Sequence, residues 1–258
     1  MRNLARTAIV SILMLAGTST FAQRLQVYYF QRPPLYFTEA DGSPGGFLNE
    51  IARLILDDAK VSSAFVEMPS TRVEPSLWKM SYAAGIGWFK TAARERLARF
   101  SAPIYQDLPL VAVVNSARAR ALGHEATIDR ILGSGLTLGT IQGFSYGDFA
   151  DKAIARLKPK LETIVGEQSA LVKMVARGRA DILLLGLEEA GYLMENDRES
   201  GAALRIVKIS DAPAGTLRYI MFSKGVDAAT VARIDAAIGR VKRSRAYKRL
   251  VDFSRYLK

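Results

Sequence analysis

The chain has 258 residues, of which 49% are hydrophobic and 24% charged, a composition typical of globular proteins. It contains no cysteine and one histidine, which excludes disulfides, thiol nucleophiles, cysteine-ligated zinc and histidine-rich metal sites. Its formal charge of +11 would suit an anionic partner such as nucleic acid, so the positions of the basic residues matter.

The first 22 residues have the pattern of a secretory signal peptide. Arg2 and Arg6 precede the apolar run AIVSILMLAG, and small and polar residues follow as far as Ala22. The apolar run is short for a bilayer span, which favours a cleaved signal over a membrane anchor. We therefore expect cleavage after Ala22 and export of a soluble monomer to a bacterial periplasm.

Strands and helices alternate along the first half of the remaining chain. Runs rich in β-branched, aromatic and other apolar residues predict strands at 25–30, 64–68, 83–89 and 108–115. Apolar residues at helical spacing predict helices at 46–58 and 71–81. The first of these helices follows a strong turn signal, Asp41-Gly42.

The same alternation restarts in the second half. Strands are predicted at 135–141, 161–165, 181–186, 204–209 and 216–223, and helices at 146–157, at 169–178 and from about 228. The strand at 181–186 is apolar throughout after its first residue, as expected for a strand buried on both faces. Two alternating blocks predict two α/β lobes with parallel or mostly parallel sheets, and a ligand cleft between them.

One motif suggests a hydrolase, but the rest of the chain does not support it. Gly143-Phe144-Ser145-Tyr146-Gly147 matches the G-x-S-x-G pattern between a strand and a helix. The α/β-hydrolase fold, in which this motif holds the catalytic serine, places its catalytic histidine after the serine, whereas the one histidine here, His124, precedes it. We interpret Ser145 instead as the first residue of a capping box with Asp148.

The most basic segment, residues 242–249, lies in the predicted C-terminal helix. Val241, Leu250 and Val251 give this helix an apolar face to bury, so the basic residues are interpreted as a solvated face. No nucleic-acid motif accompanies them. We expect no nucleic-acid partner, no cofactor, no metal site and no catalytic residue.

The segment TAARERLAR places three arginines in a helix that Thr91 can cap. At about 100° per residue, Arg94 shares the inward side with Leu97 and Ala98, whereas Arg96 and Arg99 point more than about 130° away. A guanidinium beside the free N–H groups of a first helical turn is a good receptor for a carboxylate. The alternative is an internal ion pair between Arg94 and an acidic residue.

Four segments resemble family 3 of the periplasmic solute-binding proteins, the polar amino acid type. In chain order they are RPPLYFTEADGSPGGFLNEIARLI, TAARERLARFSAPIY, GLTLGTIQGFSY and ALVKMVARGRADILLLGLEEAGYLM. The second resembles the family's Thr-Pro-Glu-Arg…Phe-Ser-x-Pro-Tyr segment in its spacing. The fourth resembles its Leu…Gly-Arg-x-Asp-Ala signature, which joins a helix to a strand.

The resemblance implies a two-lobed periplasmic binding protein of type II. Lobe 1 would comprise residues 23–112 and 217–258, and lobe 2 residues 116–213, with hinge strands near 110–115 and 215–221. The lobes would close on a small carboxylate-bearing solute, which an inner-membrane ABC permease would then receive.

The resemblance also implies a set of ligand-binding residues. Arg94 would hold the ligand's carboxylate, and Glu188 would take an α-ammonium unless the ligand lacks one. Trp88 and Phe89 stand where the family usually has small hydroxyl residues, so an aromatic or larger carboxylate is a reasonable ligand. The full candidate set is Tyr29, Arg32, Tyr36, Trp88, Phe89, Thr91, Arg94, Gly143, Phe144, Ser145 and Glu188.

Two other functions fit the same resemblance. Some similar proteins are dehydratases of prephenate-like dicarboxylates, and Glu188 could act as a general acid if burial raises its pKa. Others present a ligand to a membrane sensor rather than to a permease.

Overall fold

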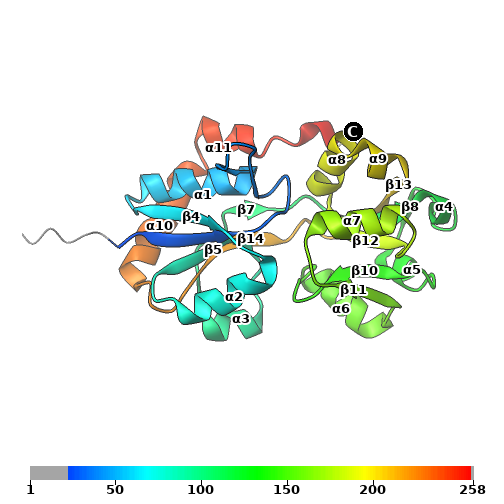
Figure 1. Ribbon diagram of the computed structural model, residues 1–258, viewed down its shortest axis with the longest axis horizontal. Helices are drawn as coiled ribbons and strands as arrows, with labels where there is room; N and C mark the ends of the chain where they lie inside the picture. The colour runs from blue at the N-terminus through cyan, green and yellow to red at the C-terminus, as the bar shows by residue number, and fades with distance from the viewer. Residues whose placement is uncertain (1–22, 257–258) are drawn as a thin grey trace, which may run out of the picture.

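The computed structural model describes residues 23–256, which form two α/β lobes lying side by side (Figure 1). The predicted signal peptide, residues 1–22, lies outside the described residues. None of the helices within 23–256 combines the length and the apolar character needed to cross a membrane.

The first lobe is built on a sheet with the order β4-β1-β5-β14-β6, to which β7 adds at β14. Its strands are β1 (Leu25–Tyr29), β4 (Ser63–Glu67), β5 (Ala83–Trp88), β6 (Arg99–Phe100), β7 (Tyr105–Gln106) and β14 (Leu217–Phe222). β1 runs parallel to β4 and β5, and β14 runs antiparallel to β5. The sheet is therefore mixed, because the chain returns to it from the second lobe in the opposite direction.

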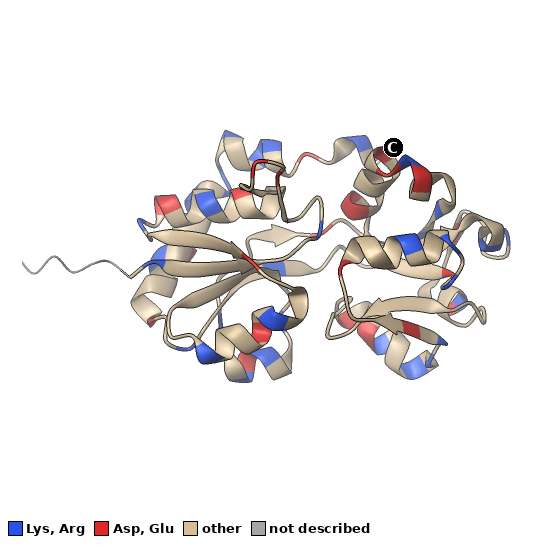
Figure 2. Ribbon diagram, viewed as in Figure 1, with Lys and Arg blue, Asp and Glu red and all other residues tan. Residues whose placement is uncertain are grey.

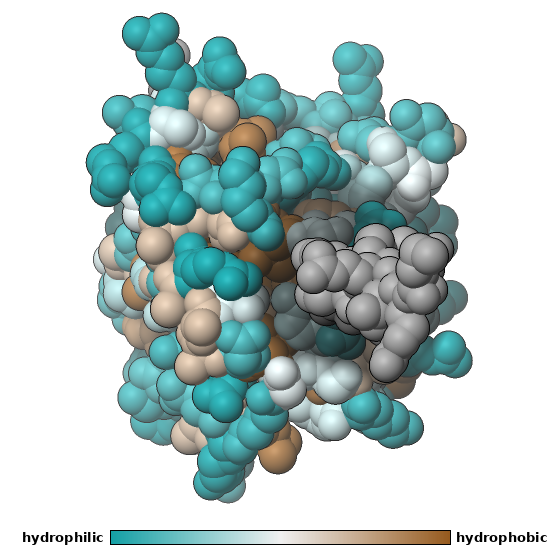
Figure 3. Space-filling view, turned by 90° about the vertical axis from the view of Figure 1, so that its left-hand side faces the viewer, coloured by the Kyte–Doolittle hydropathy of each residue, from teal (hydrophilic) through white to brown (hydrophobic). Residues whose placement is uncertain are grey.

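Helices cover both faces of this sheet (Figure 1). They are α1 (Phe47–Asp58), α2 (Ser70–Lys79), α3 (Ala92–Leu97), α10 (Ala228–Val241) and α11 (Arg245–Leu250). α1 buries Leu48, Ile51 and Ile55, so the periodicity predicted the correct inward face. Hydrophilic residues protrude over most of the outer end of this lobe, and hydrophobic residues lie mostly between them (Figure 3).

The second lobe contains a six-stranded sheet with the order β11-β10-β12-β8-β13-β9. Its strands are β8 (Leu110–Asn115), β9 (Glu125–Ala126), β10 (Leu138–Ile141), β11 (Leu161–Ile164), β12 (Ile182–Gly186) and β13 (Leu204–Ile209). β12 is buried on both faces, as its apolar sequence predicted. β8 runs antiparallel to both β12 and β13, so this sheet is also mixed.

Two apolar layers sandwich the second sheet. One packs Ile182 and Leu184 against α5 (Ile128–Leu132) and α6 (Asp148–Leu157). The other packs Leu183 and Leu185 against α7 (Gln168–Ala176). The remaining helices and short elements are α4 (Ser116–Ala119), α8 (Leu187–Asn196), α9 (Arg198–Ala202), β2 (Phe37–Thr38), β3 (Pro44–Gly45) and the 3-10 helix η1 (Ser254–Tyr256).

Basic residues are distributed along the chain of both lobes and are interspersed with acidic ones (Figure 2). In the basic run 242–249, all five basic residues are exposed: Lys242, Arg243, Arg245, Lys248 and Arg249. The predicted single helix is in fact broken there, because the Ser244 hydroxyl accepts a hydrogen bond from Tyr247 N–H and begins α11.

Two short segments join the lobes, one between β7 and β8 and the other between β13 and β14. The first crossing therefore lies at 107–109, a few residues before the predicted range, because β8 belongs wholly to the second sheet. The crossings run side by side: Asp107 N–H donates to Thr216 O at 3.0 Å, and Gln106 Nε2 donates to Gly215 O at 3.0 Å.

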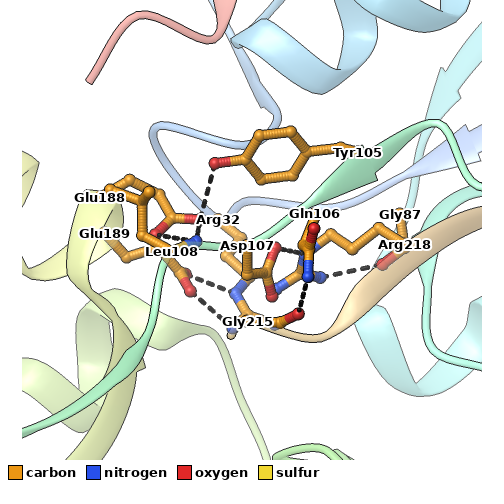
Figure 4. Close-up of polar contacts among 10 residues, drawn as sticks. All are labelled: Arg32, Gly87, Tyr105, Gln106, Asp107, Leu108, Glu188, Glu189, Gly215 and Arg218. Carbon is orange, nitrogen blue, oxygen red and sulfur yellow. Dashed lines mark hydrogen bonds and ion pairs between the residues drawn. The ribbon is translucent and has the colours of Figure 1, made fainter. Parts of the chain in front are cut away.

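Glu188, in the first turn of α8, packs against the first crossing (Figure 4). Its carboxyl group is 1% exposed. It accepts hydrogen bonds from Tyr105 Oη at 3.0 Å and from Leu108 N–H at 3.2 Å. Burial, reinforced by the charges of Asp107 and Glu189, raises the pKa of Glu188 to about 8. The folded protein therefore holds this proton at neutral pH.

Because Glu188 has a raised pKa, we expect its protonation to make the stability of the folded protein depend on pH. Glu188→Gln should remove this contribution, because glutamine does not titrate. Between pH 4.5 and about 8 the folded carboxyl keeps a proton that the unfolded one releases. The free energy of unfolding must then fall as pH rises through this window, by at most about 1.4 kcal/mol per pH unit. Urea unfolding from pH 5 to 9 should show the two proteins diverging; parallel curves would contradict the assignment.

Gly215 predicts a second, local effect on stability. A Cβ atom there would lie 1.8 Å from Asp107 O, so Gly215→Ala must push the two crossings apart. We expect a loss of about 2 kcal/mol or more in the free energy of unfolding. Gly166→Ala is a matched control, because its Cβ would meet only Ile164 Cδ1, at 3.8 Å. Equal losses in urea unfolding would contradict the predicted clash.

Candidate functional site

A small cavity, partly open to solvent, lies between the lobes. It lies at the carboxyl ends of the parallel strands β1, β5 and β10, where ligands of open α/β sheets usually bind. Its lining residues are Phe30, Arg32, Tyr36, Gly87, Trp88, Phe89, Arg94, Gly143, Phe144, Ser145 and Arg218. The cavity is thus lined by arginine and aromatic side chains from both lobes.

The position of Arg94 follows from the short helix α3. Thr91 is its N-cap, and the Thr91 hydroxyl accepts a hydrogen bond from Arg94 N–H at 3.2 Å. Arg94 is 8% exposed and Arg96 is exposed, as the helical phase predicted. Arg99 is also exposed, but it was wrongly placed in the helix, because α3 ends at Leu97 and Arg99 belongs to β6. Leu97 was expected on the same inward side but is 53% exposed, because only Arg94 of this six-residue surface helix turns inward.

The sequence left open whether Arg94 binds a carboxylate or forms an internal ion pair, and the contacts of its guanidinium are compatible with both. Nε pairs with the Glu74 carboxylate, so the internal ion pair exists. Nη1 donates to Phe89 O at 3.2 Å, and Nη2 donates to Gly143 O of the other lobe at 3.5 Å. Since a guanidinium has five N–H groups, one remains on each of Nη1 and Nη2. Those two groups can still bind an anion.

Arg32 forms a buried ion pair that joins the lobes (Figure 4). Its Nε and Nη2 donate to the two carboxylate oxygens of Glu189 at 2.6 and 2.9 Å. Burial alone would lower the pKa of Arg32, but the charge and hydrogen bonds of Glu189 outweigh it and raise the pKa. Arg32 was predicted as a ligand-binding cation, and the structure gives it an acid of the protein as its partner.

Arg218, on β14, forms a second buried pair at the crossings (Figure 4). Its Nε donates to Asp107 Oδ1 at 2.5 Å, and its Nη1 donates to Gly87 O at 2.9 Å. Burial raises the pKa of Asp107, and the charge of Arg218 opposes that rise. Burial would lower the pKa of Arg218, but the Asp107 charge raises it.

Each of the three arginines also lies over an aromatic ring of the cavity wall. The guanidinium carbon is 5.3 Å from the ring centre of Phe144 for Arg32, 4.6 Å from that of Trp88 for Arg94, and 4.5 Å from that of Phe89 for Arg218. These distances are within the range of favourable cation–π contacts. The rings therefore help to hold the arginines in place.

The structure brings most of the predicted site residues together at this cavity. Two lie elsewhere: the Tyr29 hydroxyl shares a hydrogen bond with Thr38 Oγ1 at 2.8 Å, and Glu188 faces the crossing. Thr91 acts through the helix cap rather than from the cavity wall.

Ser145 lines the cavity, but its hydroxyl is already engaged. It donates to Asp151 Oδ2 at 2.5 Å. The capping box predicted with Asp148 is wrong, because Gly147 is the N-cap of α6 and Ser145 lies two residues before it. The positive φ of Gly147, 87°, turns the chain into the helix without a side-chain cap.

The predicted set lacked three residues that line the cavity, Phe30, Gly87 and Arg218. It also lacked the three acids paired with the cavity's arginines, Glu74, Asp107 and Glu189. Arg218 carried a usable signal, since it is a lone charged residue within the apolar strand segment TLRYIMFS. The three acids carried none, because each is recognisable only by its distant arginine partner. Among residues 23–256, no group of three or more His, Cys, Asp or Glu side chains is arranged to hold a metal ion.

Comparisons with known proteins agree with this geometry. Residues 25–125 match the sequence model of the family described as bacterial extracellular solute-binding proteins, family 3. A search of curated proteins with the sequence finds no match.

Solved structures match over nearly the whole chain. An ancestral arginine-binding protein bound to arginine is 19% identical with a TM-score of 0.72, covering 91% of this chain and 98% of its own. A histidine kinase sensor domain similar to periplasmic binding proteins is 16% identical with a TM-score of 0.71, covering 91% and 96%. An ancestral amino acid-binding protein, a precursor of cyclohexadienyl dehydratase, is 18% identical with a TM-score of 0.70, also covering 91% and 96%.

The fold predicted from the sequence, a two-lobed α/β periplasmic binding protein, is thus confirmed. The predicted resemblance to family 3 solute-binding proteins is confirmed over residues 25–125, which match the family's sequence model, and the fold is shared with amino acid-binding proteins over about nine-tenths of the chain.

Proposed function

We propose that this chain is an exported binding protein that captures a small carboxylate-bearing solute between its lobes and delivers it to an inner-membrane ABC permease. The observation that carries the proposal is the buried guanidinium of Arg94, with one uncommitted N–H group on each terminal nitrogen. A planar pair of N–H donors matches the two oxygens of a carboxylate. Burial strengthens such a contact because water competes for it less.

The walls of the cavity indicate what the rest of the solute would contact. Phe30, Tyr36 and Trp88 supply apolar and aromatic surface from the first lobe, and Phe144 supplies it from the second. The ring centres of Phe30 and Phe144 are 5.7 Å apart, so the two walls meet. A solute with an apolar or aromatic body would contact both rings once the lobes part far enough to admit it, with its carboxylate on Arg94.

Contacts with both lobes would couple binding to closure. Arg94 belongs to the first lobe, and its Nη2 already reaches Gly143 O in the loop after β10 of the second. A carboxylate bound to Arg94 would also lie beside this loop. A ligand that contacts both lobes at once favours the closed arrangement over the open one.

Export and transport rest on the family and on the signal-like segment. The matched family is described as extracellular, and one similar solved structure is the substrate-binding protein of an amino acid ABC transporter. The similarity to a histidine kinase sensor domain favours a second candidate role, presentation of the ligand to a membrane sensor. Uptake of labelled solute by cells with and without the gene separates the two, since a sensory role leaves uptake unchanged.

Arg94→Ala tests the carboxylate site. We expect the affinity for a bound carboxylate to fall at least about 30-fold, or about 2 kcal/mol, because two charged hydrogen bonds are lost. Calorimetric titration measures the loss, and thermal unfolding checks that the variant is folded.

Two variants serve as controls for that substitution. Arg96→Ala removes an exposed arginine from the same helix and should bind like the wild type. Glu74→Gln removes the internal ion pair but keeps the guanidinium, so binding should be retained or tightened. Wild-type affinity in Arg94→Ala would reject Arg94 as the anion site.

We further propose that the cavity binds without turnover. Glu188, the candidate general acid, contacts Tyr105 and Leu108 and does not line the cavity. Incubation with prephenate should therefore yield no phenylpyruvate, which its absorbance in alkali would reveal. Turnover that disappears in Glu188→Gln would instead support the dehydratase.

A further inference from the structure

We infer that the solute is a carboxylate without an ammonium group, and that Arg32 is the residue that excludes one. This inference rests on the proposed function and narrows its ligand class. It is carried by the pairing of the chain's own arginines with the acids and aromatic rings at which a ligand cation would otherwise bind.

The residues that line the cavity include three arginines and no acidic residue. An ammonium group entering beside Arg32, Arg94 and Arg218 would be repelled by three guanidinium groups. A buried ammonium also requires acceptors to replace its water, and leaving it unpaired is costly. The lining therefore favours an anion and opposes a cation.

The nearby acids are already neutralised. Both Glu189 oxygens accept hydrogen bonds from Arg32, Asp107 pairs with Arg218, and Glu74 pairs with Arg94. Asp107 and Glu189 line the adjoining cavity, where the same two arginines accompany them. An ammonium that approached either carboxylate would have to compete with a fixed guanidinium.

Three of the five aromatic side chains that line the cavity are occupied in the same way. Phe144, Trp88 and Phe89 each have an arginine guanidinium within 5.3 Å of the ring centre. A ring face covered by a guanidinium cannot also receive an ammonium, so these three ring faces are not available to a ligand cation.

Removal of the Arg32 side chain would most directly relieve this exclusion of an ammonium group. Arg32 is 9% exposed, lines both cavities and contacts Glu189 and Phe144 together. Its guanidinium thus covers the acid and the ring of this region that could otherwise bind an ammonium group. Without it, the Glu189 carboxylate and the Phe144 ring would be free to bind such a group.

The wild-type test compares solutes that differ only in the ammonium group. Calorimetry would measure 3-phenylpropanoate against phenylalanine and 4-methylpentanoate against leucine. We expect the deaminated member of at least one pair to bind at least 10-fold more tightly than its amino acid. Tryptophan fluorescence gives a second readout, because Trp88 lies in the cavity wall.

Two variants test the role of Arg32. Arg32→Gln should shift the preference at least 10-fold toward the amino acid, because Glu189 becomes available. The double variant Arg32→Gln with Glu189→Gln should lose this shift, because it has no acid left to bind the ammonium. The double variant also leaves no unpaired buried charge, so it keeps the test valid if the single variant unfolds.

The outcomes separate the inference from the proposed function. Amino acids that bind the wild type as tightly as their deaminated partners, and lose affinity in Arg94→Ala, would overturn the inference and leave the carboxylate site standing. If none of the four solutes binds and Arg94→Ala changes nothing in a wider screen of carboxylates, both fail. If the single and double Arg32 variants show the same preference between amino acids and their deaminated partners, Arg32 and Glu189 do not control the exclusion of the ammonium group.

Discussion

The buried pairing of arginine with acidic residues is the constraint on which the junction of the two lobes depends. Arg32 and Arg218 are both almost completely buried, and a buried guanidinium without a partner would cost several kcal/mol. Glu189 and Asp107 remove that cost only if their carboxylates stay within hydrogen-bond reach. Because Arg32 and Glu189 belong to different lobes, this pair also ties the relative position of the lobes to the chemistry of the cleft.

Under the proposed function, the same pairs would determine what the cleft can recognise. A guanidinium fixed over an aromatic ring keeps donors available to an anion, yet it covers the ring and neutralises the acid that could attract a cation. Preference for an anion and exclusion of a cation would thus both follow from one arrangement of side chains. Similar solved structures bind arginine, so the fold itself does not impose this selection.

Sequence periodicity predicted most of the strands and helices, and helical phase identified Arg94 as the buried arginine. It could not supply the acids, because Arg32 and Glu189 are 157 residues apart and Arg218 and Asp107 are 111 apart. Neither pair produces a local pattern. The position predicted for the first crossing differs from the observed one for a related reason. The segment LPLVAVVN is one continuous apolar run, and only its pairing with β12 and β13 shows that its last six residues belong to the second sheet.

The two adjacent acids of α8 show how the charges at the junction are balanced. About 100° separates successive residues on a helix, so Glu188 faces the crossing while Glu189 faces Arg32. Since Glu188 keeps its proton, the two buried arginines are matched by two buried carboxylates without excess charge. Arg94 is different, because its partner Glu74 has 30% of its side chain exposed, compared with 3% for Glu189 and 8% for Asp107. Water screens the Glu74 pair most, so Arg94 retains the most positive charge for an incoming carboxylate.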